Sequence, residues 1–450
     1  MGDWDGRRLH FIGIGGAGMS GLALVAKALG ASVTGSDRAD SPYAARLRAA
    51  GIAPAIGHAA ENVPAGADVV VSTAIADDNP ELRTAREQGL RVLHRGDLLA
   101  EVSRLGRCLA VSGTHGKTTT AGMVAHVMRE CGRDPAYLIG GELRSTGANA
   151  AWGTGGWVVV EADESDRSFL KLTPEIAVVT NVEVDHHATY SSQADVERAF
   201  AEWVAPARER IAWAQAPLPE PAVRYGIGEG DLAADRVVLD AFGSHFEVDG
   251  VTVDLAVPGN HNVLNALGAL GACRAAGVPL AEAAPALVSF QGAKRRFEWR
   301  GTTATGAGVV DDYAHHPTEV RATLDAARTV GSARLVACFQ PHLYSRTRQL
   351  AVAFGRALAL ADVVVVLDVY PAREEAADYP GVSGYLVARA AADAARGRPV
   401  YWLPRHDEAI GLLERQLGAG DLLITLGAGD VDRVAAALAT DTEAAPPFGR

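Results

Sequence analysis

The stretch VSGTHGKTTTAGMVAHVM, residues 111–128, combines residue types that bind phosphate. A β-branched run reaches a glycine turn, and Gly116, Lys117 and Thr118 open a segment with helical apolar spacing. In such a turn the backbone N–H groups at a helix N-terminus face the anion, the lysine adds a positive charge, and the threonine hydroxyl can ligate Mg²⁺. The turn is shorter than the usual phosphate loop, and the alternative is a structural turn that binds no nucleotide. The residues expected around the phosphates are Gly113, Thr114, His115, Gly116, Lys117, Thr118 and Thr119.

Carboxylates and histidines follow the next two apolar runs. VVVEADESDRSFL ends a predicted buried strand on Glu161, and Asp163, Glu164 and Asp166 come directly after it. Because the carboxyl ends of parallel strands share one edge of a sheet, Glu161 is expected to meet the metal of a bound nucleotide. The alternative is a solvated acidic loop. TNVEVDHH ends the following run, and His186 within it is either a further metal ligand or a hydrogen-bonded structural histidine.

A second glycine turn lies near the N-terminus. HFIGIGGAGMSGLA fits the dinucleotide fingerprint through Gly13, Gly15 and Gly18, and Asp37 lies near the expected distance beyond it. Taken alone, this stretch predicts NAD binding. A nicotinamide enzyme has no use for a second phosphate loop at residues 111–120, however, so the motif by itself leaves the ligand open.

Two further stretches carry polar groups where apolar ones would be expected. PGNHNVLNALGAL places Asn262 and Asn265 at the opening of an Ala- and Leu-rich helix. An amide offers a donor and an acceptor together, which suits the edge of adenine, although helix capping explains these residues equally well. KRRFE, residues 294–298, supplies cations that include Arg296, and a solvated charge run is the alternative.

The last third of the chain contains VVDDYAHHPTEV and FQPHLYSRTRQL, and each begins at the end of a predicted strand. An arginine in this setting could clamp a carboxylate through two hydrogen bonds or face a transferring phosphoryl group. The polar residues of these stretches include Asp311, Asp312, Tyr313, His315, His316, His342, Arg346 and Arg348.

The elements that must position these groups alternate along the chain. Short β-branched runs such as LHFIGI, WVVVEAD and ADVVVVLDV are separated by stretches with helical spacing, which predicts an α/β fold with mostly parallel sheets. FEVDGVTVDL, residues 246–255, is an exception, because its strict alternation around Asp249 and Gly250 predicts an antiparallel hairpin at a sheet edge. The 450 residues are expected to form three domains, 1–100, 101–301 and 302–450.

Composition narrows the class of protein. The net charge of −12 comes from interspersed charges, which argues against a nucleic-acid surface or a polybasic membrane patch. We expect no signal peptide and no membrane span, and therefore a cytoplasmic protein. The 4 cysteines lie far apart in apolar surroundings and are expected to be reduced.

The order of these motifs resembles that of the Mur ligase family over essentially the whole chain. The matching stretches are HFIGIGGAGMSGLA, GSD, VSGTHGKTTT, EADESDRSFL, NVEVDHH, PGNHNVLNAL, KRRFE, DDYAHHPTE, FQPHLYSRT, DVYPAREE, GVSG and GAGD. The resemblance implies a Rossmann-like domain that binds a UDP-sugar, a central phosphate-loop ATPase domain and a C-terminal Rossmann-like domain that binds an amino acid. The first glycine turn would then face a diphosphate rather than a dinucleotide.

The resemblance also implies roles for single residues. Lys117 would contact the β- and γ-phosphates of ATP, and the Mg²⁺ ligands would be Thr118, Glu161 and His186. Asn262 and Asn265 would meet the adenine of ATP, Asp312 would approach its ribose, and Arg296 would also belong to the ATP site. The UDP-sugar would be bound by Gly15, Gly16, Ala17, Gly18, Met19, Ser20, Asp37, Ser72, Thr73 and Ala74. The amino acid and the acyl phosphate would be positioned by Tyr313, His315, His342 and Arg346, and the catalytic residues would be Lys117, His186, His315 and Arg346.

The implied reaction begins when the lactyl carboxylate of UDP-N-acetylmuramate attacks the γ-phosphate of ATP, and the amine of L-alanine then displaces phosphate from the acyl phosphate. A branch of the family that adds a tripeptide instead, and a non-catalytic UDP-sugar binding protein, are the alternatives. EADESDRSFL favours L-alanine, and the intact Lys117, Thr118 and Glu161 favour catalysis. No lysine occurs between Lys171 and Lys294, so the carbamylated lysine of several sister ligases is missing, and the segment after Ile211 lacks their Asp-Asp-Pro turn. A monomer or a homodimer is expected.

Overall fold

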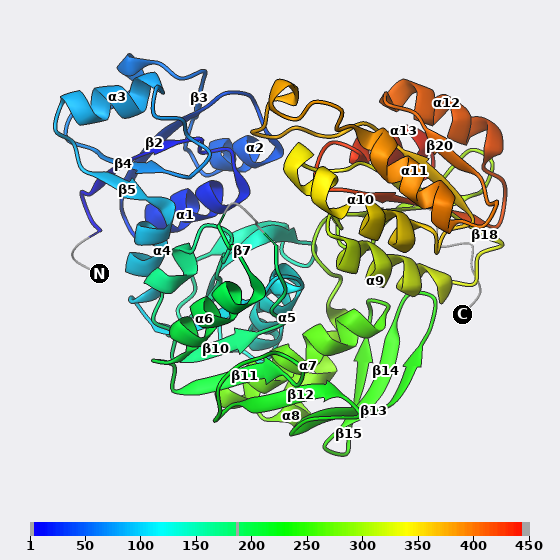
Figure 1. Ribbon diagram of the computed structural model, residues 1–450. Helices are drawn as coiled ribbons and strands as arrows, with labels where there is room; N and C mark the ends of the chain where they lie inside the picture. The colour runs from blue at the N-terminus through cyan, green and yellow to red at the C-terminus, as the bar shows by residue number, and fades with distance from the viewer. Residues whose placement is uncertain (1–3, 186–188, 443–450) are drawn as a thin grey trace. The chain divides into compact units, whose positions relative to one another are not determined.

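The computed structural model describes residues 4–185 and 189–442, which form three sheets flanked by helices (Figure 1). The predicted α/β fold is therefore confirmed. The chain divides into two compact units: the first is Met1–Asp235, Glu247–Val253 and Leu264–Gln291, and the second is Arg236–Phe246, Asp254–Val263 and Gly292–Arg450. Within the described residues, no helix is both long enough and apolar enough to cross a bilayer. The four cysteines form no disulfide, as predicted.

The first sheet is entirely parallel and has the order β3-β2-β1-β4-β5. Its strands are β1 (Arg8–Ile12), β2 (Ser32–Asp37), β3 (Ala55–Ile56), β4 (Asp68–Val71) and β5 (Val92–His94). The helices are α1 (Ala17–Ala28), α2 (Pro42–Ala49), α3 (Pro80–Glu87) and α4 (Arg95–Ser103), with a 3₁₀ turn at Ala60–Asn62. The glycine turn comes directly after β1 and before α1, so it stands at the carboxyl end of this parallel sheet.

The second sheet has ten strands in the order β15-β14-β13-β12-β11-β10-β6-β9-β7-β8. Its strands are β6 (Arg107–Ser112), β7 (Ala136–Leu143), β8 (Ala148–Ala151), β9 (Trp157–Glu161), β10 (Ile176–Val179), β11 (Glu209–Trp213), β12 (Val223–Ile227), β13 (Leu232–Leu239), β14 (Ser244–Val248) and β15 (Val251–Leu255). The helices are α5 (Lys117–Glu130), α6 (Gln193–Val204), α7 (Asn260–Ala275) and α8 (Leu280–Ala286), with 3₁₀ turns at Ser168–Lys171 and Leu287–Ser289. The predicted hairpin is confirmed as β14 and β15 at one edge. Strand β6 lies parallel to both β9 and β10, so three motif-bearing strand ends face the same way.

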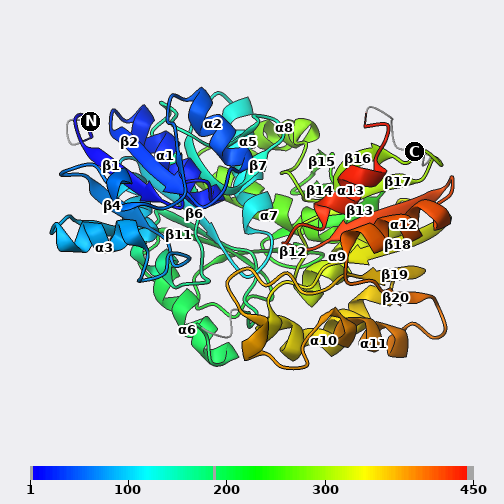
Figure 2. The same ribbon diagram turned by 90° about the horizontal axis from the view of Figure 1, so that it is seen from above.

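The third sheet has the order β16-β17-β21-β18-β19-β20, and only β16 is antiparallel to its neighbour. Its strands are β16 (Glu298–Thr302), β17 (Gly308–Asp312), β18 (Arg334–Phe339), β19 (Val363–Val366), β20 (Val400–Trp402) and β21 (Asp421–Leu426). The helices are α9 (Pro317–Arg328), α10 (Tyr344–Leu358), α11 (Gly384–Ala394), α12 (His406–Gln416) and α13 (Asp432–Leu438), with a 3₁₀ turn at Ala376–Asp378. Figure 2 shows α10 and α11 side by side, and a Cβ added to Gly355 would lie 2.4 Å from the carbonyl carbon of Ala390. The expected boundary near residue 301 falls inside β16, and the bounds of the three expected domains stay predictions.

A buried carboxylate organises the first sheet. Glu81 has no exposed surface, and its Oε2 accepts a hydrogen bond from Ser36 at 2.5 Å and lies 3.2 Å from Nε2 of His10. Its Oε1 accepts from the Asn62 amide at 2.7 Å and from the Ala59 N–H at 3.2 Å. Burial alone would raise the pKa of Glu81, but these hydrogen bonds outweigh burial and lower the pKa to about 2.

Replacing Glu81 with Gln should therefore destabilise the fold in a pH-dependent way. The pKa of Glu81 lies below its ordinary value of 4.5, so its ionised form contributes stability above that pH and loses it as the pH falls toward 2. We expect E81Q to lower the free energy of unfolding by about 2–3 kcal/mol near neutral pH. Chemical denaturation at several pH values measures this, with E61Q at an exposed site as the control. A deficit that does not shrink below about pH 4.5 would contradict the assignment.

Candidate active site

The phosphate loop connects β6 to α5 and is built around two glycines. Gly116 precedes α5 with a φ of 80°, and no side chain caps the helix. Gly113 has a φ of 139°, and a Cβ there would lie 2.0 Å from Oγ1 of Thr180. Both positions therefore require glycine. Since the first N–H groups of α5 have no side-chain partner, the loop presents the donors that an anion needs.

The segment after β10 fixes the shape of this loop. The His115 N–H donates to Oδ1 of Asn181 at 2.8 Å, and the Asn181 amide donates back to the His115 carbonyl at 3.3 Å. The Thr114 hydroxyl donates to the Glu183 carbonyl at 3.0 Å. Asn181 was not among the predicted site residues, although it stands within TNVEVDHH.

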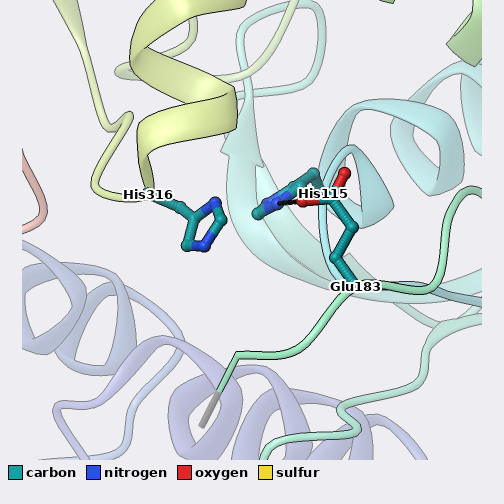
Figure 3. A group of neighbouring side chains, drawn as sticks. All are labelled: His115, Glu183 and His316. Carbon is teal, nitrogen blue, oxygen red and sulfur yellow. Dashed lines mark ion pairs between the residues drawn. The ribbon is translucent and has the colours of Figure 1, made fainter. Parts of the chain in front are cut away.

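Figure 3 shows the side chains of His115 and Glu183 next to each other, with Nε2 of His115 3.5 Å from Oε2 of Glu183. The third side chain in Figure 3, His316, belongs to the second unit, where it caps the start of α9 together with Glu319. The predicted metal ligand His186 lies outside the described residues.

A hydroxyl and a carboxylate meet beside the phosphate loop. The Thr118 hydroxyl donates to Oε1 of Glu161 at 3.0 Å, and the Gly140 N–H on β7 donates to Oε2 of Glu161 at 2.6 Å. A Cβ on Gly140 would lie 2.8 Å from Oε1 of Glu161, so this approach requires glycine. Hydroxyl and carboxylate oxygens at this place fit a Mg²⁺ ion that accompanies a bound nucleotide. The sequence indicated Thr118 and Glu161 but missed Gly140, because its contribution comes from the backbone.

Lys117 is the first residue of α5 and is largely buried. Its ammonium donates to the carbonyls of Gly113 at 2.6 Å and Thr114 at 3.1 Å, and to Oε1 of Glu164 at 3.0 Å. Burial lowers the pKa of Lys117, but Glu164, Asp163 and Glu161 outweigh burial and raise it above its ordinary value. The side chain therefore carries a positive charge at neutral pH.

The N-terminal glycine turn is held by a carboxylate. The Gly15 N–H donates to Oδ2 of Asp37 at 2.8 Å, and the Ser41 hydroxyl donates to the Gly15 carbonyl at 3.0 Å. Gly16 precedes α1, and no side chain caps this helix. The predicted Ser72, Thr73 and Ala74 follow β4, which neighbours β1 in the sheet. Asp37 thus shapes the turn, while its contact with a nucleoside stays a prediction.

One cavity of the first unit is lined both by residues of α1 and by Glu161. Its volume is about 230 Å³. The lining includes Gly18, Arg95, Ile139, Gly140, Glu161 and Asp163. Arg95, on α4, forms an ion pair with Asp163, with its Nη2 2.5 Å from Oδ2. A Cβ added to Gly18 would lie 3.3 Å from Nη1 of Arg95. A ligand that starts at the α1 turn can therefore reach Glu161 without leaving this cavity.

The two predicted adenine contacts differ in their surroundings. Asn265 accepts a hydrogen bond from the Thr120 hydroxyl at 3.2 Å, and its Oδ1 would lie 2.4 Å from a Cβ on Gly116. Asn262 donates to the Pro258 carbonyl at 2.7 Å. Asn265 therefore packs against the phosphate loop, and the contact of either residue with adenine stays a prediction.

In the second unit, Asp312 ends β17. Its carboxylate accepts from the N–H groups of Phe297 and Ala314, both at 2.7 Å. Burial raises the pKa of Asp312 to about 6, against the lowering effects of Arg296 and these amides. The Cζ atom of Arg296 lies 5.2 Å from the centroid of the Tyr313 ring. Its Nη1 lies 3.7 Å from Oε1 of Glu319. The part that Asp312 and Arg296 play in nucleotide binding stays a prediction.

Aromatic side chains of the second unit form a row. Tyr313 and His315 make an edge-on contact with their ring centroids 5.3 Å apart, and the ring centroids of His315 and His342 lie 6.0 Å apart. Tyr370, which was not among the predicted site residues although it stands within DVYPAREE, stacks on His342 with the ring centroids 5.8 Å apart. The buried Arg346 brings Nη1 within 3.3 Å of Nδ1 of His342. The structure thus gathers the four residues predicted to position the amino acid.

Three family profiles match the chain in sequence: "Mur ligase family, catalytic domain" over residues 8–107, "Mur ligase middle domain" over 111–273 and "Mur ligase, glutamate ligase domain" over 295–429. Together with the fold, these matches define the class of protein. The chain belongs to the Mur ligase family.

Within the family, the chain is similar to proteins named UDP-N-acetylmuramate--L-alanine ligase. It is 46% identical to that of Rubrobacter xylanophilus over 443 residues, covering 95% of this chain and 98% of the relative. It is 47% identical to that of Streptomyces coelicolor over 444 residues, with 94% and 95% coverage.

Among solved structures, the fold matches UDP-N-acetylmuramate-alanine ligase MurC from Thermotoga maritima with a TM-score of 0.84 and 30% identity, covering 96% of this chain and 98% of that one. A murein peptide ligase from Psychrobacter arcticus matches with a TM-score of 0.72 and 27% identity, again over 96% and 98%.

Replacing Gly140 with Ala should displace Glu161, because the new Cβ would occupy the space of its carboxylate. We expect the G140A variant to lose roughly tenfold in ADP affinity when Mg²⁺ is present and to change little when Mg²⁺ is chelated. Calorimetric titration under both conditions measures this. G411A, at a helical glycine where a Cβ would make only an ordinary contact at 3.5 Å, is the control. Equal losses with and without Mg²⁺ would contradict the assignment of Glu161.

Proposed function

We propose that this protein is an ATP-dependent ligase that joins the lactyl carboxylate of UDP-N-acetylmuramate to the amine of L-alanine, as a step in making peptidoglycan precursors for cell-wall growth, cell shape and division. The observation that carries the proposal is the cavity between α1 and Glu161. It gives a sugar nucleotide held at the first glycine turn a path to Glu161, whose carboxylate accepts a hydrogen bond from Thr118 beside the phosphate loop. The names of the relatives support L-alanine as the acceptor.

The first step is transfer of the γ-phosphoryl group to the lactyl carboxylate. The N–H groups of the loop and the ammonium of Lys117 hold the β- and γ-phosphates and offset the charge that spreads over the transferring group. Thr118 and Glu161 are the residues that would hold Mg²⁺, which supplies further charge neutralisation when it is bound. His186 completes that ligand set in this proposal. The products of the step are ADP and an acyl phosphate.

The second step is attack of the amine on the acyl phosphate. The guanidinium of Arg346 binds the carboxylate of L-alanine, and the row of Tyr313, His315 and His342 orients its amine. The amine forms a bond to the acyl carbon, the bond from that carbon to the phosphate oxygen breaks, and phosphate leaves with the electron pair. A proton lost from the amine passes to His315 or to water.

A tripeptide acceptor is the second candidate, because a murein peptide ligase shares the fold over 96% of this chain. The higher TM-score of the alanine ligase and the names of the curated relatives favour L-alanine. We also propose that the protein acts in the cytoplasm, which agrees with a chain whose described helices include none that could cross a bilayer.

Phosphate release from ATP tests the proposed function. The assay contains Mg²⁺ and UDP-N-acetylmuramate, with either L-alanine or L-Ala-γ-D-Glu-meso-diaminopimelate as the acceptor. We expect release only with L-alanine, and a loss of about a thousandfold or more in K117A. Release only with the tripeptide would identify the second candidate. No release with either acceptor would contradict ligase activity.

Replacing Arg346 with Lys should weaken binding of L-alanine specifically. Lysine keeps the charge but cannot form the paired hydrogen bonds of a guanidinium with a carboxylate, so we expect the KM for L-alanine to rise about 10- to 100-fold. The KM for ATP should stay within about threefold. R348K is the matched control, because it makes the same substitution two positions further along α10. There the Cζ atom of Arg348 lies 5.3 Å from the centroid of the Tyr379 ring. An equal rise in both KM values would argue against a dedicated carboxylate contact.

A further inference from the structure

The ammonium of Lys117 is fully occupied by acceptors of the protein itself. An ammonium has three donors, and those of Lys117 face the carbonyls of Gly113 and Thr114 and the carboxylate of Glu164. Both oxygens of Glu164 lie close to Nζ, Oε1 at 3.0 Å and Oε2 at 2.9 Å. The two oxygens of the Glu164 carboxylate therefore occupy positions on the Lys117 ammonium that two phosphate oxygens of a nucleotide could take.

Glu164 is held in this place by its surroundings. Only 2% of its side chain is exposed. Its backbone carbonyl accepts hydrogen bonds from the Tyr190 hydroxyl at 2.7 Å and from the Arg167 N–H at 3.0 Å. Arg167 itself takes a left-handed conformation with a φ of 60°, which turns the chain back after the acidic stretch. The ion pair is thus a built feature of the loop after β9 and not an exposed side-chain contact.

We propose that Glu164 is a positioning residue that competes with nucleotide phosphates for Lys117. This inference rests on the proposed function, because it assigns the loop to nucleotide. Phosphate oxygens must replace the Glu164 carboxylate on the ammonium, and the buried carboxylate then loses its ion pair with Lys117, which reduces the net gain from binding. ATP offers γ-phosphate oxygens that ADP lacks, so the exchange favours ATP. After phosphoryl transfer, Glu164 regains Lys117 and promotes release of ADP.

The E164Q variant tests this directly. Glutamine keeps the size of the side chain and removes the competing charge. We expect ADP to bind on the order of tenfold more tightly to E164Q than to wild type, and to dissociate correspondingly more slowly. Titration calorimetry with ADP and Mg²⁺ on the full chain measures the affinity, and stopped-flow release of a fluorescent ADP analogue measures the rate. A purely structural role would weaken binding, so the direction of the change separates the two explanations.

A double-mutant cycle assigns the gain to Lys117. In a K117A background, E164Q should change ADP affinity by less than about twofold, because no ammonium remains to compete for. D166N is the matched control, since Asp166 lies in the same loop but faces Arg95 and His94. It should also leave ADP affinity within about twofold.

Several results would overturn the proposal: unchanged or weaker ADP binding by E164Q, an equal gain in the K117A background, or an equal gain in D166N. If E164Q does not fold, E164D should show a smaller gain in the same direction, and its failure to do so would be decisive. Wild-type protein that binds no ADP would contradict the proposed function itself, and this proposal with it. Wild-type protein that binds ADP while E164Q gains nothing would contradict this inference alone.

Discussion

The site depends on how two helices of the first unit begin. Both α1 and α5 start directly after a glycine turn, and no side chain caps the N-terminus of either helix. The N–H groups of an uncapped helix N-terminus are satisfied by water or by an anion, so α1 and α5 each offer donors to an anionic ligand at the carboxyl end of a strand. The carboxylate of Asp37 and the amide of Asn181 shape the two turns through backbone groups. One cavity is lined both by the first residues of α1 and by Glu161, which accepts a hydrogen bond from Thr118 of α5.

Charge is balanced pairwise around that cavity. Arg95 faces Asp163 and Asp166, while Lys117 faces Glu164, and burial strengthens each of these attractions. Arg95 and Lys117 lower the pKa of Asp163 well below its ordinary value, in spite of the burial that opposes this. Glu161 is held differently, by hydrogen bonds from the Thr118 hydroxyl and the Gly140 N–H. A divalent ion that enters together with a polyphosphate offsets part of the negative charge of that polyphosphate.

The sequence predicted the parts of this arrangement that follow from periodicity and motif spacing. Strand ends carry the polar motifs, and because parallel strands align their carboxyl ends, Thr118 and Glu161 were expected to meet although 43 positions separate them. Gly140 was missed because it acts through its backbone, and Tyr370 was missed because the stretch DVYPAREE, which contains it, suggested no role for a single residue. The contact between Lys117 and Glu164 lies in a loop with a left-handed residue, Arg167, and motif spacing does not reveal the path of such a loop.

In the proposed reaction, the carboxylate of the sugar nucleotide is activated as an acyl phosphate beside Lys117. The most direct measurement follows oxygen. UDP-N-acetylmuramate labelled with ¹⁸O in its lactyl carboxylate is turned over with ATP and L-alanine, and the released phosphate is analysed by mass spectrometry. We expect one ¹⁸O atom to pass from the carboxylate into phosphate for each amide formed, because the carbon–oxygen bond breaks when the amine attacks. Phosphate free of ¹⁸O, with amide still formed, would contradict it.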